Sequence, residues 1–538
     1  MAKTLTRMLF IVFLAVLVIT GCDTTSTGSI TEDRTLHIVS GSENQTLEPI
    51  IQTWASDNGY AVNMTYMGTV DIARMLQSGQ VSYDAVWPAN RLWIDYGDTH
   101  NLTKHVQSIM RSPVVFGVKR SIAERLGWIG EDIYMDDIVT ATESGEIRFM
   151  MTSATQSNSG ASFYFAALTA FAEKSGDVIT SDDLESANVE ADIKRILGTV
   201  DRSSGSSGWL KDLFLDQYER YDAMVNYEAL IIEANQELEQ AGHEPLYAIY
   251  PVDGLAIADS PLGYVERNIE GKEDIFLELQ QYLLTEDVQR ELLNAGRRTS
   301  TLGIQLTDAN RDVFRPEWGI DVDRVIQPIR FPNAEVIQQA LDLYQTSFRR
   351  PSCTVYVLDF SGSMSGQGEA DLKAAMRTLL DQSIATQYLL QGHPKDVSSV
   401  VLFNDTIING NRLDQWTVEG NDEAELRNLY LQIERTQAGN GTDIFNAALA
   451  GLEHLEEIRT QECLPSVILM TDGRDGGNGY SAFQSYVRQS ENDVPVFAIT
   501  FGDADPEQLR PATTLTSARI FDGTSDLVSA FRSAKGYN

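Results

Sequence analysis

The sequence has little cysteine, little histidine and little positive charge. It contains three cysteines and six histidines in 538 residues, and the histidines at 37, 100, 105, 243, 393 and 454 form no cluster. Lysine and arginine total 41 against 77 aspartates and glutamates, which gives a formal net charge of −36. Nucleic acid selects basic surfaces, so this balance argues against a nucleic-acid partner and indicates a solvated acidic surface.

Three familiar catalytic motifs are also missing. No HExxH, GxSxG or GxxxxGK[ST] pattern occurs, so the usual signatures of zinc proteases, serine hydrolases and P-loop proteins are absent. The apolar fraction of 43% is normal for folded protein. The length fits about three or four domains of ordinary size.

The sequence has one long hydrophobic run, and it is too short to span a bilayer. This run, residues 8–19, follows Lys3 and Arg7, whereas a membrane-spanning helix needs about 20 apolar residues. A positive start and a short apolar core are typical of a signal peptide. With "ITGC" ending at Cys22, the stretch resembles a bacterial lipoprotein signal. The resemblance implies cleavage after residue 21 and a lipid anchor on Cys22; the alternative is a secreted protein with a chance cysteine there.

The two other cysteines, Cys353 and Cys463, then form an even pair in an oxidising compartment. Each stands just before an apolar run that has the character of a strand. If those strands are neighbours, a disulfide would join their starts. Two buried free thiols explain the same sequence, so both interpretations stay open.

Short strand-like runs alternate with helical patterns from about 35 to 345, which predicts α/β architecture with mainly parallel sheets. A helix at about 334–347 precedes "SFRRPSC", and a new α/β pattern begins at 353. The expected organisation is a signal peptide (1–21), a polar tether (22–34), a first α/β unit (35–333), a linker helix (334–350) and a C-terminal α/β domain (351–538).

The strand-like run at 354–360 ends in an acid and closely spaced serines. Asp359, Ser361 and Ser363 fall in the loop that follows this buried strand, where ligands of parallel sheets bind. Oxygen ligands suit a hard cation such as Mg²⁺, Mn²⁺ or Ca²⁺. One loop cannot complete the coordination, and Thr442 in "GNGTDIF" and Asp472 in "TDGRDGG" have the right context to contribute.

Together, "DFSGS", Thr442 and "TDG" resemble the metal-ion-dependent adhesion site (MIDAS) of von Willebrand factor A (VWA) domains. The resemblance covers about 353–538 and implies a doubly wound, Rossmann-like fold. It implies that Ser361, Ser363 and Thr442 offer hydroxyls to the metal, while Asp359 and Asp472 bind it directly or through water. Such a cation keeps affinity for a carboxylate of a partner protein. Haloacid-dehalogenase phosphatases also have an Asp directly after a strand, but they need a second Asp two residues later. This chain has Ser361 at that position, which counts against phosphoryl transfer.

Residues 35–333 resemble type 2 periplasmic solute-binding proteins in layout, with two α/β lobes around a cleft. The resemblance implies a first lobe to about 112, a second lobe at about 113–245 and a return through 248–258. Polar residues near helix starts are expected to contact a small polar or anionic solute: Ser40, Ser42, Thr69, Ser157, Ser159, Ser206 and Asn226. Helix capping alone explains the pattern too. Trp87, Tyr227 and Glu228 are further candidates for the cleft wall, and packing explains them as well.

The two halves together resemble bacterial lipoproteins that combine a substrate-binding domain with a VWA domain. The resemblance implies a non-enzymatic binding protein, lipid-anchored to the membrane of the cell envelope and facing the periplasm or exterior. An alternative is the solute receptor of an ABC-type importer with an accessory VWA domain. A metal-dependent hydrolase is the third hypothesis, and no general base is recognisable beside the metal loops to support it.

Overall fold

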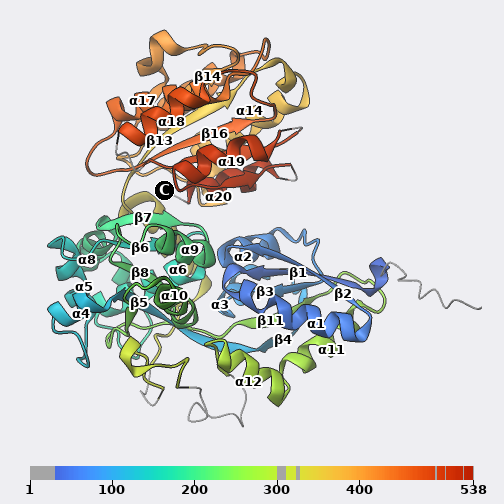
Figure 1. Cartoon of the computed structure of the whole chain (residues 1–538), viewed down its shortest axis with the longest axis vertical. Coiled ribbons are helices and arrows are strands. Elements are labelled where there is room, and N and C mark those ends of the chain that lie inside the picture. The colour runs from blue at the N-terminus through green and yellow to red at the C-terminus, as the bar shows by residue number, and fades with distance from the viewer. Residues whose placement is uncertain are drawn as a thin grey trace, which may run out of the picture.

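The computed structural model describes residues 31–299, 311–322, 327–490, 494–502, 504–524 and 526–536. The expected signal peptide, Cys22 and residues 22–30 of the expected tether lie outside the described residues. Figure 1 shows two α/β lobes side by side and a third α/β domain above them. None of the described helices combines the length and the hydrophobicity needed to cross a membrane.

Lobe one contains a five-stranded sheet in the order β2-β1-β3-β11-β4. Its strands are β1 (Thr35–Gly41), β2 (Ala61–Met67), β3 (Ala85–Trp87), β4 (Thr103–Ser108) and β11 (Pro261–Val265). Its helices are α1 (Glu48–Asn58), α2 (Thr69–Ser78), α3 (Leu92–Gly97), α11 (Lys272–Leu283) and α12 (Glu286–Asn294). Strand β1 pairs in parallel with β2 and β3. Its carboxyl end lies next to lobe two, because Ser42, the residue after β1, contacts Ser206 there.

Lobe two contains a seven-stranded sheet built around the order β10-β5-β8-β6-β7, with β9 and β12 also paired to β5. The strands are β5 (Met110–Lys119), β6 (Phe149–Thr152), β7 (Val200–Ser204), β8 (Ala223–Tyr227), β9 (Leu246–Ile249), β10 (Ile257–Ala258) and β12 (Arg298–Thr299). The helices include α5 (Met135–Glu143), α6 (Asn158–Phe171), α8 (Ala187–Gly198), α9 (Ser207–Asp216) and α10 (Glu228–Ala241).

The second lobe extends further along the chain than the sequence predicts. Strands β9 and β10 both pair antiparallel with β5, so the lobe runs to Ala258 rather than to about 245. The chain returns to lobe one only with β11. The difference arises because antiparallel pairing between distant segments leaves no mark in local hydrophobic periodicity.

The expected linker helix is part of the lobe-two core. It consists of α13 (Ala334–Leu343) and a π-helical turn, η5 (Tyr344–Phe348). Ile337, Leu341 and Phe348 are buried in the same cluster as the residues of α6 and α8. The Tyr164 hydroxyl also donates to the Ala340 carbonyl at 2.9 Å. The C-terminal domain therefore starts from a segment that is fixed to lobe two.

The C-terminal domain is a doubly wound α/β fold with the strand order β15-β14-β13-β16-β17-β18. Its strands are β13 (Ser352–Asp359), β14 (Val397–Phe403), β15 (Thr417–Glu419), β16 (Leu464–Thr471), β17 (Val496–Thr500) and β18 (Ile520–Asp522). Only β15 is antiparallel to its neighbour. One face is covered by α14 (Gln367–Leu380), α16 (Glu423–Arg435) and α20 (Leu527–Lys535), and the other by α17 (Ile444–Ile458), α18 (Tyr480–Gln489) and α19 (Pro506–Leu515).

A disulfide joins Cys353 and Cys463, whose Cα atoms are 5.6 Å apart. Strands β13 and β16 are parallel neighbours, and Ser352 lies opposite Leu464. The two cysteines therefore close a link between the starts of adjacent strands, and the free-thiol alternative does not describe this structure.

The C-terminal domain contacts both lobes. Arg202 on β7 of lobe two donates to the Ser517 carbonyl at 2.9 Å. On lobe one, the Arg74 guanidinium lies 5.5 Å from the ring centre of Tyr388. Residues of the C-terminal helix α20 reach both lobes, as discussed below. The domain consequently rests across the opening of the cleft between the lobes.

Candidate metal centre and solute cleft

The five predicted metal-site residues come from three loops at one edge of the C-terminal sheet. Strand β13 ends at Asp359, and the short helix η6 (Gly362–Met364) follows with Ser361 and Ser363 at its start. Asp472 directly follows β16, the parallel neighbour of β13. Thr442 lies in the loop between α16 and α17. Carboxyl ends of parallel strands share one edge, which explains why residues so distant in sequence meet.

Hydrogen bonds connect the oxygen atoms of two of these loops. The Ser361 backbone N–H donates to Asp359 Oδ1 at 2.7 Å, and Ser361 Oγ lies 3.1 Å from Ser363 Oγ. The Ser363 hydroxyl then donates to Asp472 Oδ1 at 2.8 Å. A continuous row of oxygen atoms thus runs from β13 to the end of β16. Ser361 is buried and Ser363 is exposed, so the row opens to the surface.

Backbone contacts bring the Thr442 loop to the same place. The Gly476 N–H donates to the Thr442 carbonyl, and the Gly362 N–H donates to the Asn440 carbonyl, both at 2.9 Å. A Cβ atom built on Gly473 would lie 3.1 Å from Ser363 Oγ and 3.5 Å from Thr442 Oγ1. Glycine at this position lets the two hydroxyls lie close to the β16 loop.

Thr471 belongs to the site and was not predicted from the sequence. Its hydroxyl donates to Asp359 Oδ2 at 2.6 Å and accepts from the Gly473 N–H at 3.1 Å. Thr471 is fully buried at the last position of β16, so the sequence pattern does not distinguish it from a packing residue of the strand. Its place one residue before Asp472, in "TDG", is the signal that could have identified it.

The site holds two carboxylates and no other ionisable ligands. Burial raises the pKa of Asp359, and hydrogen bonds from Thr471 and Ser361 oppose part of this rise, while the charge of Asp472 adds to it. Within the described chain, no group of three His, Cys, Asp or Glu side chains is placed to hold a metal. Any cation held here would therefore depend on neutral hydroxyl oxygens as well as on the two acids.

The spacing of these oxygens fits a small divalent cation. Neighbouring ligands of an octahedral ion with metal–oxygen distances of about 2.1 Å lie about 3 Å apart. The separations of 3.1 Å between the two serine hydroxyls and 2.8 Å between Ser363 and Asp472 are close to that value. An all-oxygen set with hydroxyls suits Mg²⁺, Mn²⁺ or Ca²⁺ rather than a soft metal.

The predicted solute-site residues of lobe two gather at two helix starts. Ser157 caps α6 and Ser206 caps α9 by position, and Ser159 lies in the first turn of α6. Ser207, which the sequence analysis did not single out, connects them: its Oγ lies 2.9 Å from Ser157 Oγ and 2.8 Å from Ser159 Oγ. Asn226 Nδ2 donates to the Ser207 carbonyl at 3.0 Å.

Several of the other candidates serve the packing of their own lobe. The Ser40 hydroxyl donates to the Trp87 carbonyl at 3.3 Å and accepts from Asn44 Nδ2 at 3.1 Å. Thr69 Oγ1 accepts from the Ala89 N–H at 3.1 Å. Trp87, a candidate cleft wall, is completely buried in the core of lobe one.

Tyr227 and Glu228, the other candidates for the cleft wall, also form polar contacts within lobe two. The Tyr227 hydroxyl accepts from Asn158 Nδ2 at 3.0 Å. Glu228 is fully buried and binds the Arg298 guanidinium through both carboxylate oxygens at 2.7 Å. The Glu228–Arg298 pair links α10 to β12 and is a structural ion pair of lobe two.

The two lobes are closed on each other through direct hydrogen bonds. Ser42 of lobe one accepts from the Ser206 hydroxyl at 2.7 Å and from the Gly208 N–H at 3.0 Å. The Val70 N–H of lobe one donates to the Gln156 carbonyl of lobe two at 3.0 Å. The free N–H groups at the starts of α9 and α2 are thus bound by oxygens from the opposite lobe. Backbone N–H groups at helix starts are donors that anionic ligands commonly use in proteins.

A small cavity of about 20 Å³ lies between the lobes. Glu43, Asn44 and Arg297 line it, together with Arg111, Tyr227 and Ser260. Glu43 Oε1 and Asn44 Oδ1 are buried acceptors without a hydrogen-bond partner among the described residues. Burial raises the pKa of Glu43 to about 7, against the opposing effects of its own backbone N–H and of Arg297.

Comparison with known protein families agrees with this architecture. Residues 36–298 match the family described as bacterial extracellular solute-binding protein, and residues 355–526 match the von Willebrand factor type A domain. The chain therefore consists of a solute-binding-protein domain followed by a VWA domain. The resemblance inferred from the sequence and its expected fold class are confirmed.

One curated relative matches part of the chain. Inter alpha-trypsin inhibitor heavy chain 4 of Mus musculus is 30% identical over 158 residues, which are 28% of this chain and 15% of that protein. The chain thus covers only a small part of this relative's length.

Solved structures similar to this chain include several solute-binding proteins. The sulfate-binding protein SubI of Mycobacterium tuberculosis is 17% identical, with a TM-score of 0.36, covering 49% of this chain and 87% of that one. The apo ferric ion-binding protein A of Pasteurella haemolytica is 12% identical, with a TM-score of 0.43 and coverages of 58% and 98%. A solute-binding protein of Thermotoga lettingae with bound α-D-tagatose is 14% identical, with a TM-score of 0.43 and coverages of 58% and 92%. Likeness at this level carries no information on the solute of this chain.

Proposed function

We propose that this protein is a non-enzymatic, lipid-anchored binding protein of the bacterial cell envelope. Its VWA domain binds a divalent cation, Mg²⁺ or alternatively Mn²⁺ or Ca²⁺, through Asp359, Ser361, Ser363, Thr442 and Asp472. The cation in turn binds a carboxylate of a partner protein. The single observation that carries this proposal is the row of oxygens formed by Ser361, Ser363 and Asp472 at octahedral spacing.

Charge explains why such a site would bind an outside acid. Hydroxyl ligands are neutral, so only the two aspartates supply negative charge to balance a divalent ion. The Asp359 carboxylate also accepts hydrogen bonds from the Thr471 hydroxyl and the Ser361 N–H. A further anionic oxygen completes the coordination favourably. A surface cavity of about 350 Å³ next to Asp472, lined by residues of α14 and of the loop after β17, offers a partner room.

The metal half of the proposal is tested by titrating the full chain with Mn²⁺ and measuring free ion by electron paramagnetic resonance. Ser363→Ala removes the central hydroxyl of the row and is expected to weaken Mn²⁺ binding at least tenfold. Ser365→Ala is the matched control, because Ser365 is an exposed serine of the same loop. Equal Mn²⁺ affinity in both variants and in the unchanged protein would refute the assignment.

The carboxylate half needs a separate readout. With Mn²⁺ bound, added acetate should displace a metal-bound water and lower the relaxation rate of solvent protons. Relaxation that does not respond to acetate at millimolar concentration, while Mn²⁺ remains bound, would remove the partner-carboxylate step and leave the metal site intact.

We further propose that the clamshell binds a small polar or anionic solute between Ser42, Ser206 and the starts of α2, α6 and α9. The support is that these groups face each other across the closed cleft and satisfy donors that an oxygen-rich solute would use. A thermal-shift screen of anions and amino acids tests this, since a ligand at a hundred times its Kd stabilises the folded form by about 2.7 kcal/mol. A solute that stabilises the unchanged chain and fails to stabilise Ser42→Ala would support the assignment.

The match of residues 36–298 to extracellular solute-binding proteins favours a second candidate, the receptor of an ABC-type importer. Uptake of a specific solute would then require this protein but tolerate loss of residues 351–538. Uptake that also fails in cells producing only the solute-binding domain, with that domain folded and exported, would favour the two-domain receptor over the importer subunit.

A further inference from the structure

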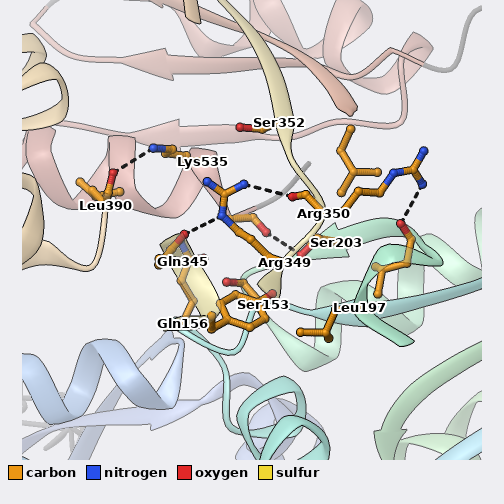
Figure 2. A pocket seen from close by; sticks show the side chains of 14 residues that line it. Ser153, Gln156, Leu197, Ser203, Gln345, Arg349, Arg350, Ser352, Leu390 and Lys535 are labelled. Carbon is orange, nitrogen blue, oxygen red and sulfur yellow. Dashed lines mark hydrogen bonds between the residues drawn. The ribbon is translucent and has the colours of Figure 1, made fainter. Parts of the chain in front are cut away.

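A cavity of about 40 Å³ lies where lobe two, the linker segment and the VWA domain meet (Figure 2). Lobe two contributes Ser153 and Ser203 to its wall, the segment after η5 contributes Arg349 and Arg350, and α20 of the VWA domain contributes Lys535. The cavity shares no residue with the metal centre or with the predicted solute contacts. We refer to it as the junction cavity.

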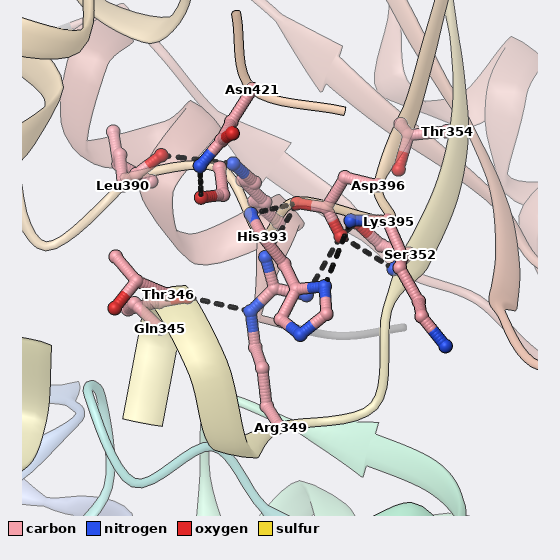
Figure 3. Close-up of polar contacts among 12 residues, drawn as sticks. Gln345, Thr346, Arg349, Ser352, Thr354, Leu390, His393, Lys395, Asp396 and Asn421 are labelled. Atoms are coloured by element: carbon pink, nitrogen blue, oxygen red, sulfur yellow. Dashed lines mark hydrogen bonds and ion pairs between the residues drawn. The ribbon is translucent and has the colours of Figure 1, made fainter. Parts of the chain in front are cut away.

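The described lining of the junction cavity contains three cations and no carboxylate. Two of these cations are compensated from outside the cavity. Arg349 donates to both oxygens of the buried Asp396, at 3.0 and 2.6 Å, as Figure 3 shows. Arg350 lies 3.5 Å from Asp201 and donates to the Val200 carbonyl at 3.1 Å.

Lys535 has no such compensation. Its ammonium donates to the Leu390 carbonyl at 3.0 Å, and no carboxylate of the described chain forms an ion pair with it. Burial lowers the pKa of Lys535 to about 8, although the charge of Asp396 acts in the opposite direction. Burying an ammonium group without a directly paired carboxylate is unfavourable, and an anion bound in the junction cavity would offset that cost.

The size of the junction cavity limits the ligand. One water molecule needs about 10–15 Å³, so a cavity of about 40 Å³ accommodates roughly three waters or one small oxyanion. A larger ligand such as a nucleotide or a peptide does not fit. The donors suit oxygen atoms: two guanidinium groups and one ammonium line the space, while the hydroxyls of Ser203 and Ser352 in the same wall donate to the Gly536 carbonyl and to Asp396.

We propose that the junction cavity binds one small oxyanion, of the size of phosphate or sulfate, between Arg349, Arg350 and Lys535. Because Arg349 and Arg350 follow the linker segment that is fixed to lobe two, and Lys535 belongs to the VWA domain, the anion connects the clamshell to the VWA domain. Binding therefore favours the docked arrangement of the two domains. The site shares no residue with the proposed metal centre or with the predicted solute contacts.

The test is calorimetric titration of the detergent-purified full chain with phosphate, and in parallel with sulfate and acetate, at constant chloride and ionic strength. Lys535→Met keeps the length of the side chain and removes its charge, and it is expected to weaken phosphate binding at least tenfold. Lys535→Arg restores the charge and should bind phosphate. Lys395→Met is the matched control, since Lys395 is exposed and pairs with Glu462 outside the cavity.

The cleft between the lobes is a second place where an anion can bind, and the variants separate the two. Heat that persists unchanged in Lys535→Met and is lost in Ser42→Ala belongs to the cleft and overturns the junction site. A second readout follows domain docking: phosphate should slow tryptic cleavage between Arg349 and Arg350 in the unchanged chain but not in Lys535→Met.

Folding of the key variant can be checked without any ligand. Since methionine removes a buried charge that has no paired carboxylate, Lys535→Met should melt no lower than the unchanged chain in anion-free buffer. The proposal is overturned if phosphate, sulfate and acetate all give no saturable heat with the unchanged chain. It is overturned equally if Lys535→Met, folded by this criterion, binds phosphate with unchanged affinity.

Discussion

Arg532 of the VWA helix α20 forms an ion pair with Asp71 on helix α2 of lobe one. The same guanidinium donates to the Thr155 carbonyl of lobe two, and its Nε donates to the Tyr388 carbonyl of the VWA domain at 2.8 Å. One buried side chain therefore contacts all three bodies of the protein. These contacts can form together only when the lobes are closed.

Replacement of Arg532 by methionine should loosen the closed clamshell. The substitution removes the contacts to both lobes, whereas the contacts of Arg74 of lobe one with the Tyr388 ring and the Gln387 carbonyl remain. We expect a larger radius of gyration in small-angle X-ray scattering and a wider distance distribution between spin labels on the two lobes. Arg510→Met is the control, because Arg510 is exposed and pairs only with Glu507 in its own helix. Identical scattering curves for Arg532→Met and the unchanged chain would contradict the expectation.

Thr471 gives a prediction for the metal centre. Thr471→Val removes the hydroxyl that donates to Asp359 Oδ2 while preserving the shape of a buried strand residue. Groups that orient metal ligands typically contribute 10–100-fold to affinity, so Mn²⁺ binding should weaken by about that factor. The measurement is the Mn²⁺ titration described above.

Thr354→Val is the matched control for this experiment. Thr354 lies at the other end of β13, where its hydroxyl is 3.2 Å from Ser466 Oγ of β16. The substitution removes a similar buried hydrogen bond between the same two strands, far from the metal centre. If both variants lose Mn²⁺ affinity equally, the effect comes from strand pairing and Thr471 has no special role.

That the proposed metal ligands lie near one another could be predicted from the sequence, because they follow a simple rule. Asp359 and Asp472 end neighbouring buried strands, and parallel strands bring their carboxyl ends to one edge of the sheet. Thr471 was not predicted as a site residue because it is the last residue of a strand whose other residues are mostly buried in the core. Its hydroxyl has a role only through Asp359, a residue 112 positions away along the chain.

The arrangement of the domains could not be predicted in the same way. The pairing of Phe116 with Ile249 places β9 in lobe two, and nothing local in the sequence indicates it. The contacts of Arg532 and Lys535 depend on how two separately folded units dock. In the sequence, both residues look like ordinary basic residues of the last helical turn, where a positive charge interacts favourably with the helix dipole.

The disulfide should contribute strongly to the stability of the VWA domain. Cys353 and Cys463 are 110 residues apart, and linking distant residues restricts the unfolded chain. We expect the double variant Cys353→Ser/Cys463→Ser to lose about 2–4 kcal/mol in free energy of unfolding. Denaturant unfolding followed by circular dichroism measures this. The unchanged chain in reducing agent should match the variant, and a variant as stable as the oxidised chain would contradict the expectation.

The Arg349–Asp396 pair predicts how stability depends on pH where the linker segment joins the VWA domain. Burial raises the pKa of Asp396, but the charge and hydrogen bonds of Arg349, together with the charge of Lys535 and the Ser352 N–H, outweigh burial and lower this pKa to about 2. The ordinary value is 3.8, so the folded state favours the charged carboxylate. Its stabilising contribution, about 2 kcal/mol from the size of the shift, is fully present above pH 4 and is lost as the pH falls toward 2.

Asp396→Asn isolates this contribution. The amide cannot carry the charge that Arg349 requires, so the variant should be less stable by about 3–5 kcal/mol at pH 7, because a buried guanidinium is left without its partner. Between pH 4 and pH 2 the unchanged chain should lose about 2 kcal/mol of its advantage, so the difference between the two unfolding free energies should shrink by that amount. Asp371→Asn, on an exposed turn of α14 where Asp371 accepts only from Gln367, is the control and should follow the unchanged chain at every pH. A constant difference between Asp396→Asn and the unchanged chain across this range would show that the pair does not titrate as its geometry requires.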